Sequence, residues 1–167
     1  MSTDPVGLKG TCDCILKNKI SSNTLTPMMH NEVEDFKGNN LVRANTFDGG
    51  CDIRSAENVL ITPQSYKIVS TGLRVAIPNG YVGMVRGRSG LAFKHGVWCF
   101  QGTIDSGYRG ELKCILYNIS NTPFTVQIGD RIAQLVTVLV SLQNYVEVEE
   151  LPITNDNRNG GYGSTGR

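Results

Sequence analysis

A carboxylate and an aromatic side chain three residues apart stand in the most informative segment of the chain. This segment, GTIDSGYRGE, runs from Gly102 to Glu111 and contains Asp105 and Tyr108. Glycine, serine and aspartate favour tight turns, so the pattern predicts a β-hairpin. Taken alone, the segment is explained by an ordinary hairpin in which Asp105 favours the turn and Tyr108 packs against its side.

A second segment, RSGLA at residues 88–92, combines a guanidinium group, a hydroxyl group and the first backbone N–H groups of a predicted helix. Unpaired N–H groups and the helix dipole both favour an anion, so this arrangement suits a phosphate. Ordinary helix capping is the alternative explanation.

Three further segments carry weaker signals. GDRIAQLV at residues 129–136 is a turn leading into an apolar strand that Gln134 interrupts, and a buried glutamine either closes a structural network or faces a ligand. NGGYGSTG at residues 159–166 is a glycine-rich chain end with one aromatic ring and two hydroxyl groups. DGGCDI at residues 48–53 is a glycine turn that enters a strand and includes Asp52.

The elements that must position these segments are short strands. Alternating apolar and polar residues predict strands from residue 58 onward. We expect them at residues 73–77, 81–86, 97–104, 111–118, 124–128, 132–140 and 145–149, with Phe124, Val126 and Ile128 on a buried face. Turn residues separate them at 78–80, 106–107, 121–123 and 129–130. One short helix is predicted, with Ser89 as its N-cap and Gly96 as its end. The pattern indicates an all-β sandwich or barrel with one short helix.

Size and charge limit the possible functions. A chain of 167 residues fits one domain with a real core. The net charge of +1 provides no global field for nucleic acid or an anionic membrane, so we expect neither partner. No apolar run is long enough to span a membrane, and the N-terminus lacks a secretory signal, which predicts a soluble intracellular protein of the cytoplasm or nucleus. The five cysteines lack zinc-site spacing and are predicted to be free thiols.

The chain divides into three expected parts. Residues 1–14 are predicted to form a flexible N-terminal arm, and residues 15–153 the β domain. Within that domain, residues 15–20 fit a strand and residues 30–47 fit an insertion. Residues 154–167 contain little to bury and are predicted to form a flexible tail.

In this order, the five segments resemble the five motifs of the trimeric dUTP pyrophosphatase (dUTPase) family over residues 48–166. The resemblance implies a jelly-roll-like β subunit, a homotrimer with active sites at the subunit interfaces, and dUTP as the substrate. It implies Mg²⁺-assisted attack of water on the α-phosphorus, which yields dUMP and pyrophosphate. Such a reaction limits uracil incorporation into DNA and supplies dUMP for thymidylate synthesis.

The resemblance also implies residue roles. Asp105 would be the general base, Tyr108 would lie under the deoxyribose, and the hairpin main chain, with Gly102 and Ile104, would hold uracil. Phosphate contacts would come from Arg88, Ser89, Gly90 and Gln134. Asp52 would hold Mg²⁺ through a water molecule. The tail would close as a lid that contacts the nucleotide through Arg158, Gly161, Tyr162, Gly163, Ser164 and Thr165.

Arg158 stands one position later than the usual arginine of the fifth motif, where this chain has Asn157. Two alternative functions remain open. A dCTP deaminase shares the fold, but Tyr108, Gln134 and the glycine-rich tail argue against it. A non-catalytic nucleotide-binding protein would keep the pocket, and the retention of Asp105 argues against that alternative.

Overall fold

The computed structural model describes residues 32–35 and 41–153 as ten strands and one short helix. In chain order the elements are β1 Glu32–Asp35, β2 Gly50–Arg54, β3 Val59–Ile61, β4 Ser65–Ala76, β5 Tyr81–Gly87, α1 Ser89–His95, β6 Val97–Cys99, β7 Gly102–Ile104, β8 Leu112–Asn118, β9 Phe124–Val126 and β10 Arg131–Leu139. The prediction of an all-β fold with one short helix is confirmed.

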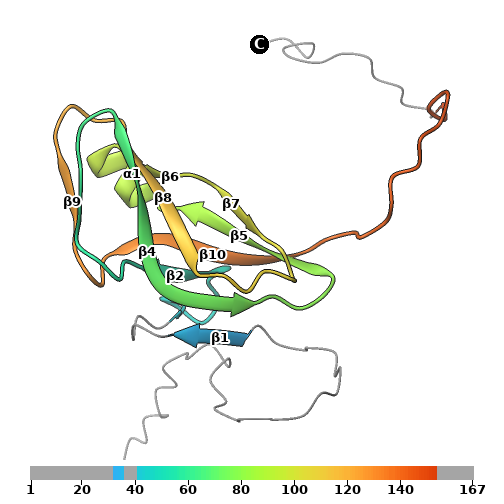
Figure 1. Ribbon diagram of the computed structural model, residues 1–167, viewed down its shortest axis with the longest axis horizontal. Coiled ribbons are helices and arrows are strands. Elements are labelled where there is room, and N and C mark those ends of the chain that lie inside the picture. The colour runs from blue at the N-terminus through green and yellow to red at the C-terminus, as the bar shows by residue number, and fades with distance from the viewer. Residues whose placement is uncertain (1–31, 36–40, 154–167) are drawn as a thin grey trace, which may run out of the picture.

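The strands form a jelly-roll-like sandwich (Figure 1). One four-stranded sheet has the order β1-β4-β8-β6, the other has the order β2-β10-β5-β7, and β3 pairs with β9 in a short ribbon. The pairings within these sheets are antiparallel. Sequence neighbours are therefore often in different sheets, and residues far apart along the chain lie side by side.

The core lies between the two four-stranded sheets. Strand β8 alternates strictly between buried and exposed residues, and Leu112, Cys114 and Leu116 point inward. From the opposite sheet, Ile53 and Leu135 are buried in the same hydrophobic cluster. Burial of these aliphatic side chains is the main stabilising contribution to such a sandwich.

The stretch predicted as one strand at residues 97–104 is two strands, which corrects the prediction. Strand β6 pairs with β8, whereas β7 pairs with β5 in the other sheet. The chain crosses between the sheets at Phe100 and Gln101. A continuous apolar run does not reveal such a crossing, because both halves are good strand formers.

Two local predictions are also wrong. Ser89 is the first residue of α1 and not its N-cap, which is Arg88 with no side-chain capping bond. Gly96 ends the helix in the left-handed conformation, with φ of 64°, as predicted. Ile128 is 61% exposed because β9 stops at Val126 and the chain turns.

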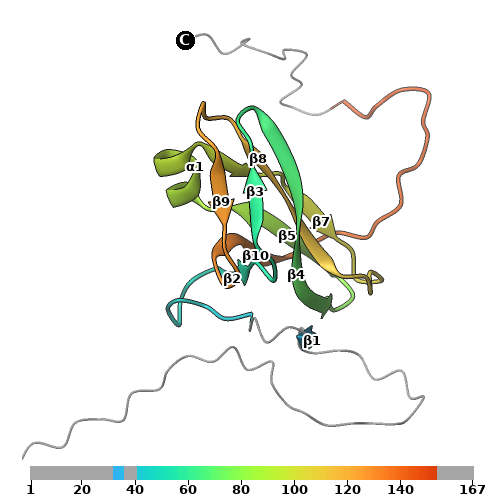
Figure 2. The same ribbon diagram turned by 60° about the vertical axis from the view of Figure 1, so that its left-hand side comes forward.

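The strand predicted at residues 145–149 is absent, and residues 140–153 form an extended arm instead. Figures 1 and 2 show this arm leaving the end of β10 and running away from the sheets. Where the arm begins, the Val140 N–H donates a hydrogen bond to the Gly80 carbonyl at 2.9 Å. An alternating sequence needs a neighbouring strand, and the described part of one chain offers none here.

Some predictions lie outside the described residues, namely the N-terminal arm at 1–14, the strand at 15–20 and the tail at 154–167. Within the predicted insertion at 30–47, β1 pairs with β4 and Leu41 joins the core. Its status as an insertion stays a prediction. The described cysteines, Cys51, Cys99 and Cys114, are not in disulfide bonds, as predicted for them. Among the described helices, none is long and apolar enough to cross a membrane.

Candidate active site

The centre of the candidate site is the carboxylate of Asp52 on β2, which is 5% exposed. Its Oδ1 atom accepts a hydrogen bond from Arg88, and its Oδ2 atom is 3.4 Å from the Arg131 Nη1 atom. A buried charge is tolerated when it is paired and hydrogen-bonded. Asp52 therefore fixes two guanidinium groups, one from the junction of β5 and α1 and one from β10.

Strand register brings a third motif to the same place. Gln134 on β10 lies opposite Asp52 on β2 and opposite Arg86 on β5. The Gln134 side chain is half-buried and makes no side-chain hydrogen bond within the described part of the chain. Within the described part of the chain the amide group of Gln134 is thus available to a ligand, which favours the ligand-facing alternative.

Arg88, Ser89 and Gly90 lie where β5 ends and α1 begins. The Arg88 carbonyl accepts the N–H groups of Leu91 and Ala92, at 3.1 and 3.2 Å, so the helix begins there. The N–H groups of Ser89 and Gly90 precede the first helical bonds and have no partner within the helix. The sequence thus places a guanidinium group and free N–H donors together at this junction.

Open pockets flank Arg88 on two sides. One pocket of about 340 Å³ contains Arg88 and Arg131 together with Lys94 and His95. The other, of about 280 Å³, extends from Arg88 and Ser89 towards Cys99 and Gln101. The cationic side chains of Arg88, Lys94 and Arg131 outnumber the one carboxylate in the lining of the first pocket, Asp130, so this pocket suits a highly negative group.

One thiol, that of Cys99, lines the second pocket, and it is hydrogen-bonded to the Cys114 thiol on the adjacent strand. The hydrogen bond with Cys114 on β8 lowers the pKa of the Cys99 thiol on β6, although burial acts in the opposite direction. The same hydrogen bond, with burial, raises the pKa of Cys114. Cys114 is therefore a neutral thiol at physiological pH.

The predicted hairpin exists, with Asp105 and Tyr108 at its tip. The Tyr108 N–H donates to the Asp105 carbonyl at 3.0 Å and closes the turn. Arg109 supports it further, because its Nη1 atom donates to the carbonyls of Ser106 and Tyr108, both at 2.7 Å. The Asp105 side chain is exposed, and Tyr108 is 42% exposed.

Within one chain, the tip of the hairpin is distant from Arg88 and from the N–H groups that suit a phosphate. Ile104 lies opposite Gly83 on β5, whereas Arg88 follows the far end of that strand. Gly83 and Arg88 are five residues apart, which corresponds to about 17 Å at the usual rise of a strand. One chain thus brings together Asp52, Arg88, Ser89, Gly90 and Gln134. It holds Ile104, Asp105 and Tyr108 elsewhere, and Gly102 lies between the two groups, opposite Val85.

The carboxylate oxygens of Asp52 suit a magnesium ion that is held through a water molecule. The described residues hold no group of three or more His, Cys, Asp or Glu side chains that would form a metal cage. The Asp52 carboxylate already accepts hydrogen bonds, and a carboxylate oxygen has room for a further donor such as a metal-bound water. Magnesium dehydrates reluctantly and usually keeps several waters, so this chemistry suits it.

Arg131 is the site residue that sequence reasoning missed. It belongs to the fourth motif, but its type and spacing give no sign of a role. Its ion pair with Asp52 joins residues 79 positions apart and depends on the pairing of β10 with β2. The predicted tail residues, Arg158, Gly161, Tyr162, Gly163, Ser164 and Thr165, lie outside the described residues.

The chain is similar to known proteins over most of its length. The model of the dUTPase family matches residues 38–166. The deoxyuridine 5'-triphosphate nucleotidohydrolase of Zymomonas mobilis is 50% identical over 119 residues, which are 70% of this chain and 81% of that protein.

Solved structures agree with this match. A mutant dUTPase of Staphylococcus bacteriophage 80alpha with dUpNHpp has a TM-score of 0.77 at 28% identity, covering 87% of this chain and 99% of that one. A mutant dUTPase of phage phi11 of S. aureus, described for its coordination of a structural Mg(II) ion, has a TM-score of 0.67 at 30% identity, covering 72% and 97%.

Replacing Asp52 tests its role as the shared partner of Arg88 and Arg131. We expect Asp52→Asn to lower the free energy of unfolding by about 2 kcal/mol, because hydrogen bonds to a charged group are lost and an amide N–H₂ faces a guanidinium group. Urea unfolding at fixed protein concentration measures this loss. Asp48→Asn is the matched control, since Asp48 accepts bonds from nearby Asn45 at 2.9 and 3.1 Å in an exposed turn. Equal effects of the two variants would contradict the assignment.

Proposed function

The chain belongs to the dUTPase family and hydrolyses dUTP to dUMP and pyrophosphate; we propose that it does so in sites assembled from several copies of the chain. The observation that carries this proposal is the separation of about 17 Å along β5 between the level of the hairpin and Arg88. A general base must come within hydrogen-bond reach of the water that it activates. Asp105 can therefore act on a substrate bound at Arg88 only if that Arg88 belongs to another copy of the chain.

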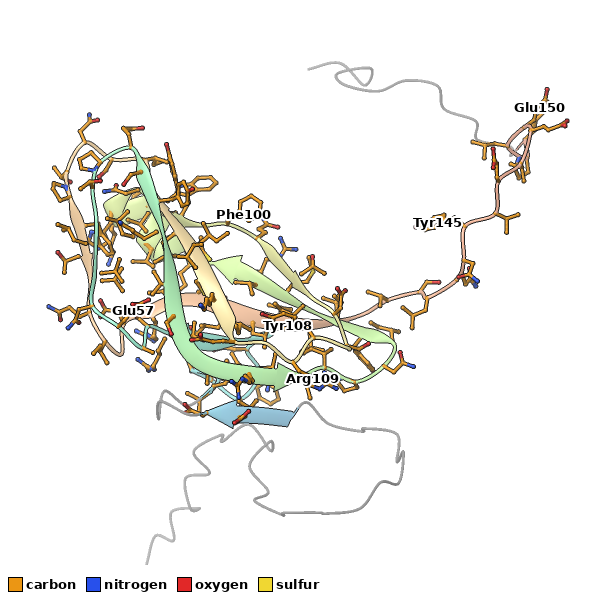
Figure 3. All side chains as sticks on the ribbon, in the orientation of Figure 1. Glu57, Phe100, Tyr108, Arg109, Tyr145 and Glu150 are labelled. Atoms are coloured by element: carbon orange, nitrogen blue, oxygen red, sulfur yellow. The ribbon has the colours of Figure 1, made fainter. Side chains whose placement is uncertain are left out.

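An exposed apolar sheet face supports the assembly. The register places Tyr66 opposite Tyr117 and Ile68 opposite Ile115 on the outer face of the β1-β4-β8-β6 sheet. Phe100 also projects from the surface near β6 and β7 (Figure 3). Monomeric proteins rarely expose a large contiguous apolar patch. The exposed members of this outer face are Tyr66, Ile68, Trp98, Phe100, Ile115 and Tyr117.

The arm at residues 140–153 also supports an assembly of several copies. It exposes six large apolar side chains, Leu142, Tyr145, Val146, Val148, Leu151 and Ile153. Figure 3 shows Tyr145 on this arm, well away from the sheets. We propose that other copies cover the arm and the outer face, and that the closed assembly is a homotrimer, the state implied by the family resemblance.

The chemical step assigns one role to each half of the site. Asp105 accepts a proton from water while the water oxygen forms a bond to the α-phosphorus. The bond from that phosphorus to the oxygen bridging to the β-phosphate breaks, and pyrophosphate leaves. Such general-base catalysis contributes about 10²–10⁴-fold. Arg88, Gln134 and the N–H groups of Ser89 and Gly90 bind the phosphates and stabilise the charge that moves onto the leaving group.

Magnesium bound with the triphosphate would neutralise phosphate charge, and Asp52 would hold it through a water molecule. Asp52 also keeps Arg88 and Arg131 oriented towards the phosphates. Because two guanidinium groups share one carboxylate, the trio keeps a net positive charge that attracts the substrate.

Two glycines support close approach of a ligand. A Cβ atom at Gly90 would have nothing within 4 Å, and at Gly102 it would meet Val85 at an ordinary 3.7 Å. By contrast, a Cβ atom at Gly83 would be crowded at 3.2 Å by several core side chains. Packing within the chain therefore requires glycine at position 83 but not at 90 or 102. We propose that uracil approaches the main chain at Gly102 and Ile104, with the sugar over Tyr108.

The tail completes the proposed site. Tyr162 would stack on uracil, and Arg158, Ser164 and Thr165 would reach the phosphates, with Gly161 and Gly163 allowing the backbone to come close. Closure of such a segment excludes water and completes the catalytic groups.

Substrate specificity tests the function. We expect the full-length chain to release pyrophosphate from dUTP in the presence of magnesium, and to act far more slowly on dCTP, dTTP and UTP. A wrong base leaves buried polar groups of a uracil site unpaired, and this cost slows its reaction. Loss of turnover in EDTA would support the metal role. Ammonia release from dCTP, without pyrophosphate release from dUTP, would show a deaminase instead.

Asp105→Asn tests the general base. We expect kcat for dUTP to fall by about 10²–10⁴-fold, with dUTP binding retained, because the amide cannot accept the proton. Asp48→Asn is a matched control, as Asp48 accepts turn bonds from Asn45 at 2.9 and 3.1 Å and lines neither pocket beside Arg88. A rate for Asp105→Asn close to that of the wild type would remove Asp105 from this role.

Mixing two inactive variants tests the shared site. Arg88→Gln and Asp105→Asn chains damage different halves, so about a quarter of the sites in a random one-to-one mixture combine two intact halves. We expect about that fraction of wild-type activity after co-refolding, measured as pyrophosphate release. Refolded wild type controls for recovery. If the mixture has no more activity than its separate components, each site lies within one chain.

A further inference from the structure

Strand β4 contains a bulge that two carboxylates hold. Its register with β8 shifts between Ser70 and Leu73, and Gly72 adopts the left-handed conformation with φ of 69°. The Glu57 Oε1 atom accepts the Ser70 N–H at 2.6 Å. The Glu111 Oε1 atom accepts the Ser70 hydroxyl and, at 3.1 Å, the Gly72 N–H. The Glu111 carboxylate, directly before β8, therefore holds the bulge in place by hydrogen bonds.

Glu111 remains charged in this setting. Partial burial acts to raise its pKa, but hydrogen bonds from the Ser70 hydroxyl and from the Gly72 and Thr71 amides, with the Lys113 ammonium, bring the pKa below its ordinary value. The Lys113 Nζ atom is 3.7 Å from the second carboxylate oxygen. The residue is thus a persistent acceptor at neutral pH.

The same residue holds Tyr108 through its main chain. The Tyr108 hydroxyl donates to the Glu111 carbonyl at 2.9 Å. The phenol ring also lies directly over Gly110, where an added Cβ atom would be 2.5 Å from the hydroxyl oxygen and 2.7 Å from Cζ. The ring is therefore fixed by a hydrogen bond at its tip and by contact with a position that has no side chain.

We infer that Glu111 is the positioning residue that anchors Tyr108 to the β4 bulge and thereby sets the preference for deoxyribonucleotides over ribonucleotides. This inference rests on the proposed function, in which the Tyr108 face meets the sugar. A ring that can tilt away leaves space for a 2′-hydroxyl. Without the Glu111 carboxylate, residues 108–111 lose their attachment to β4, and the carbonyl that receives the Tyr108 hydroxyl is no longer held.

Glu57 provides a matched control within the same bulge. Its carboxylate binds the Ser70 N–H, but Figure 3 shows Glu57 well away from Tyr108. Removing either carboxylate weakens the bulge, whereas removing that of Glu111 also detaches the tyrosine. Loss of stability alone lowers the amount of folded enzyme and changes both substrates equally, so a ratio of activities separates the two effects.

The experiment measures kcat/KM for dUTP and for UTP with the full-length chain. We expect the ratio of dUTP to UTP to fall about tenfold in Glu111→Ala, a typical effect of losing a hydrogen bond to a charged group. Tyr108→Phe, which removes the hydroxyl, should lower the ratio similarly. Glu111→Gln should keep most of the ratio, since its amide oxygen can accept the same bonds. Glu57→Ala should leave the ratio unchanged.

Three outcomes would overturn the inference: a wild-type ratio in Glu111→Ala, an equal fall in Glu57→Ala, or a glutamine variant as defective as alanine. Each presupposes that the wild type turns over dUTP and prefers it to UTP. A wild type without dUTP turnover would instead contradict the proposed function, so the two failures are distinguishable.

Discussion

The buried carboxylate of Asp52 makes the interactions on which the arrangement of the proposed phosphate-binding residues depends. It receives Arg88 from the end of β5 and Arg131 from β10, while Gln134 faces it across the sheet. A charged group at this depth is stable with partners and costly without them. The requirement to pair one carboxylate thus fixes the relative positions of three segments that are far apart in the sequence.

The register of β5 imposes the second constraint. Arg88 follows one end of this strand, whereas the hairpin strand β7 pairs with its middle, at residues 83–85. Because a strand is stiff, no adjustment of side chains brings the tip of the hairpin to Arg88. The proposed phosphate-binding residues and the proposed general base therefore lie in different regions of the subunit, and the sheet pairing itself supports a shared site.

Local patterns in the sequence predicted the class of fold, most strands and the turn of the hairpin, because these depend on alternation and on glycine, proline and aspartate. The failures involve distant partners. The crossing at Phe100 and Gln101 depends on which sheet each half joins, and the absence of a strand at residues 145–149 depends on the lack of a neighbour. Ser89 was mistaken for the N-cap because its hydroxyl suits that role, although Arg88 holds the capping conformation. The roles of Arg131 and Glu111 were missed because they depend on the long-range pairings of β2 with β10 and of β4 with β8.

The arm at residues 140–153 links the abundance of the protein to its solubility and activity. With the assembly proposed above, a newly synthesised chain has an uncovered arm and an uncovered sheet face until it meets other copies. Dilution favours this separated state by mass action. At low expression the chain would thus be both inactive and prone to non-specific association, so the fold ties the solubility of each subunit to the presence of its neighbours.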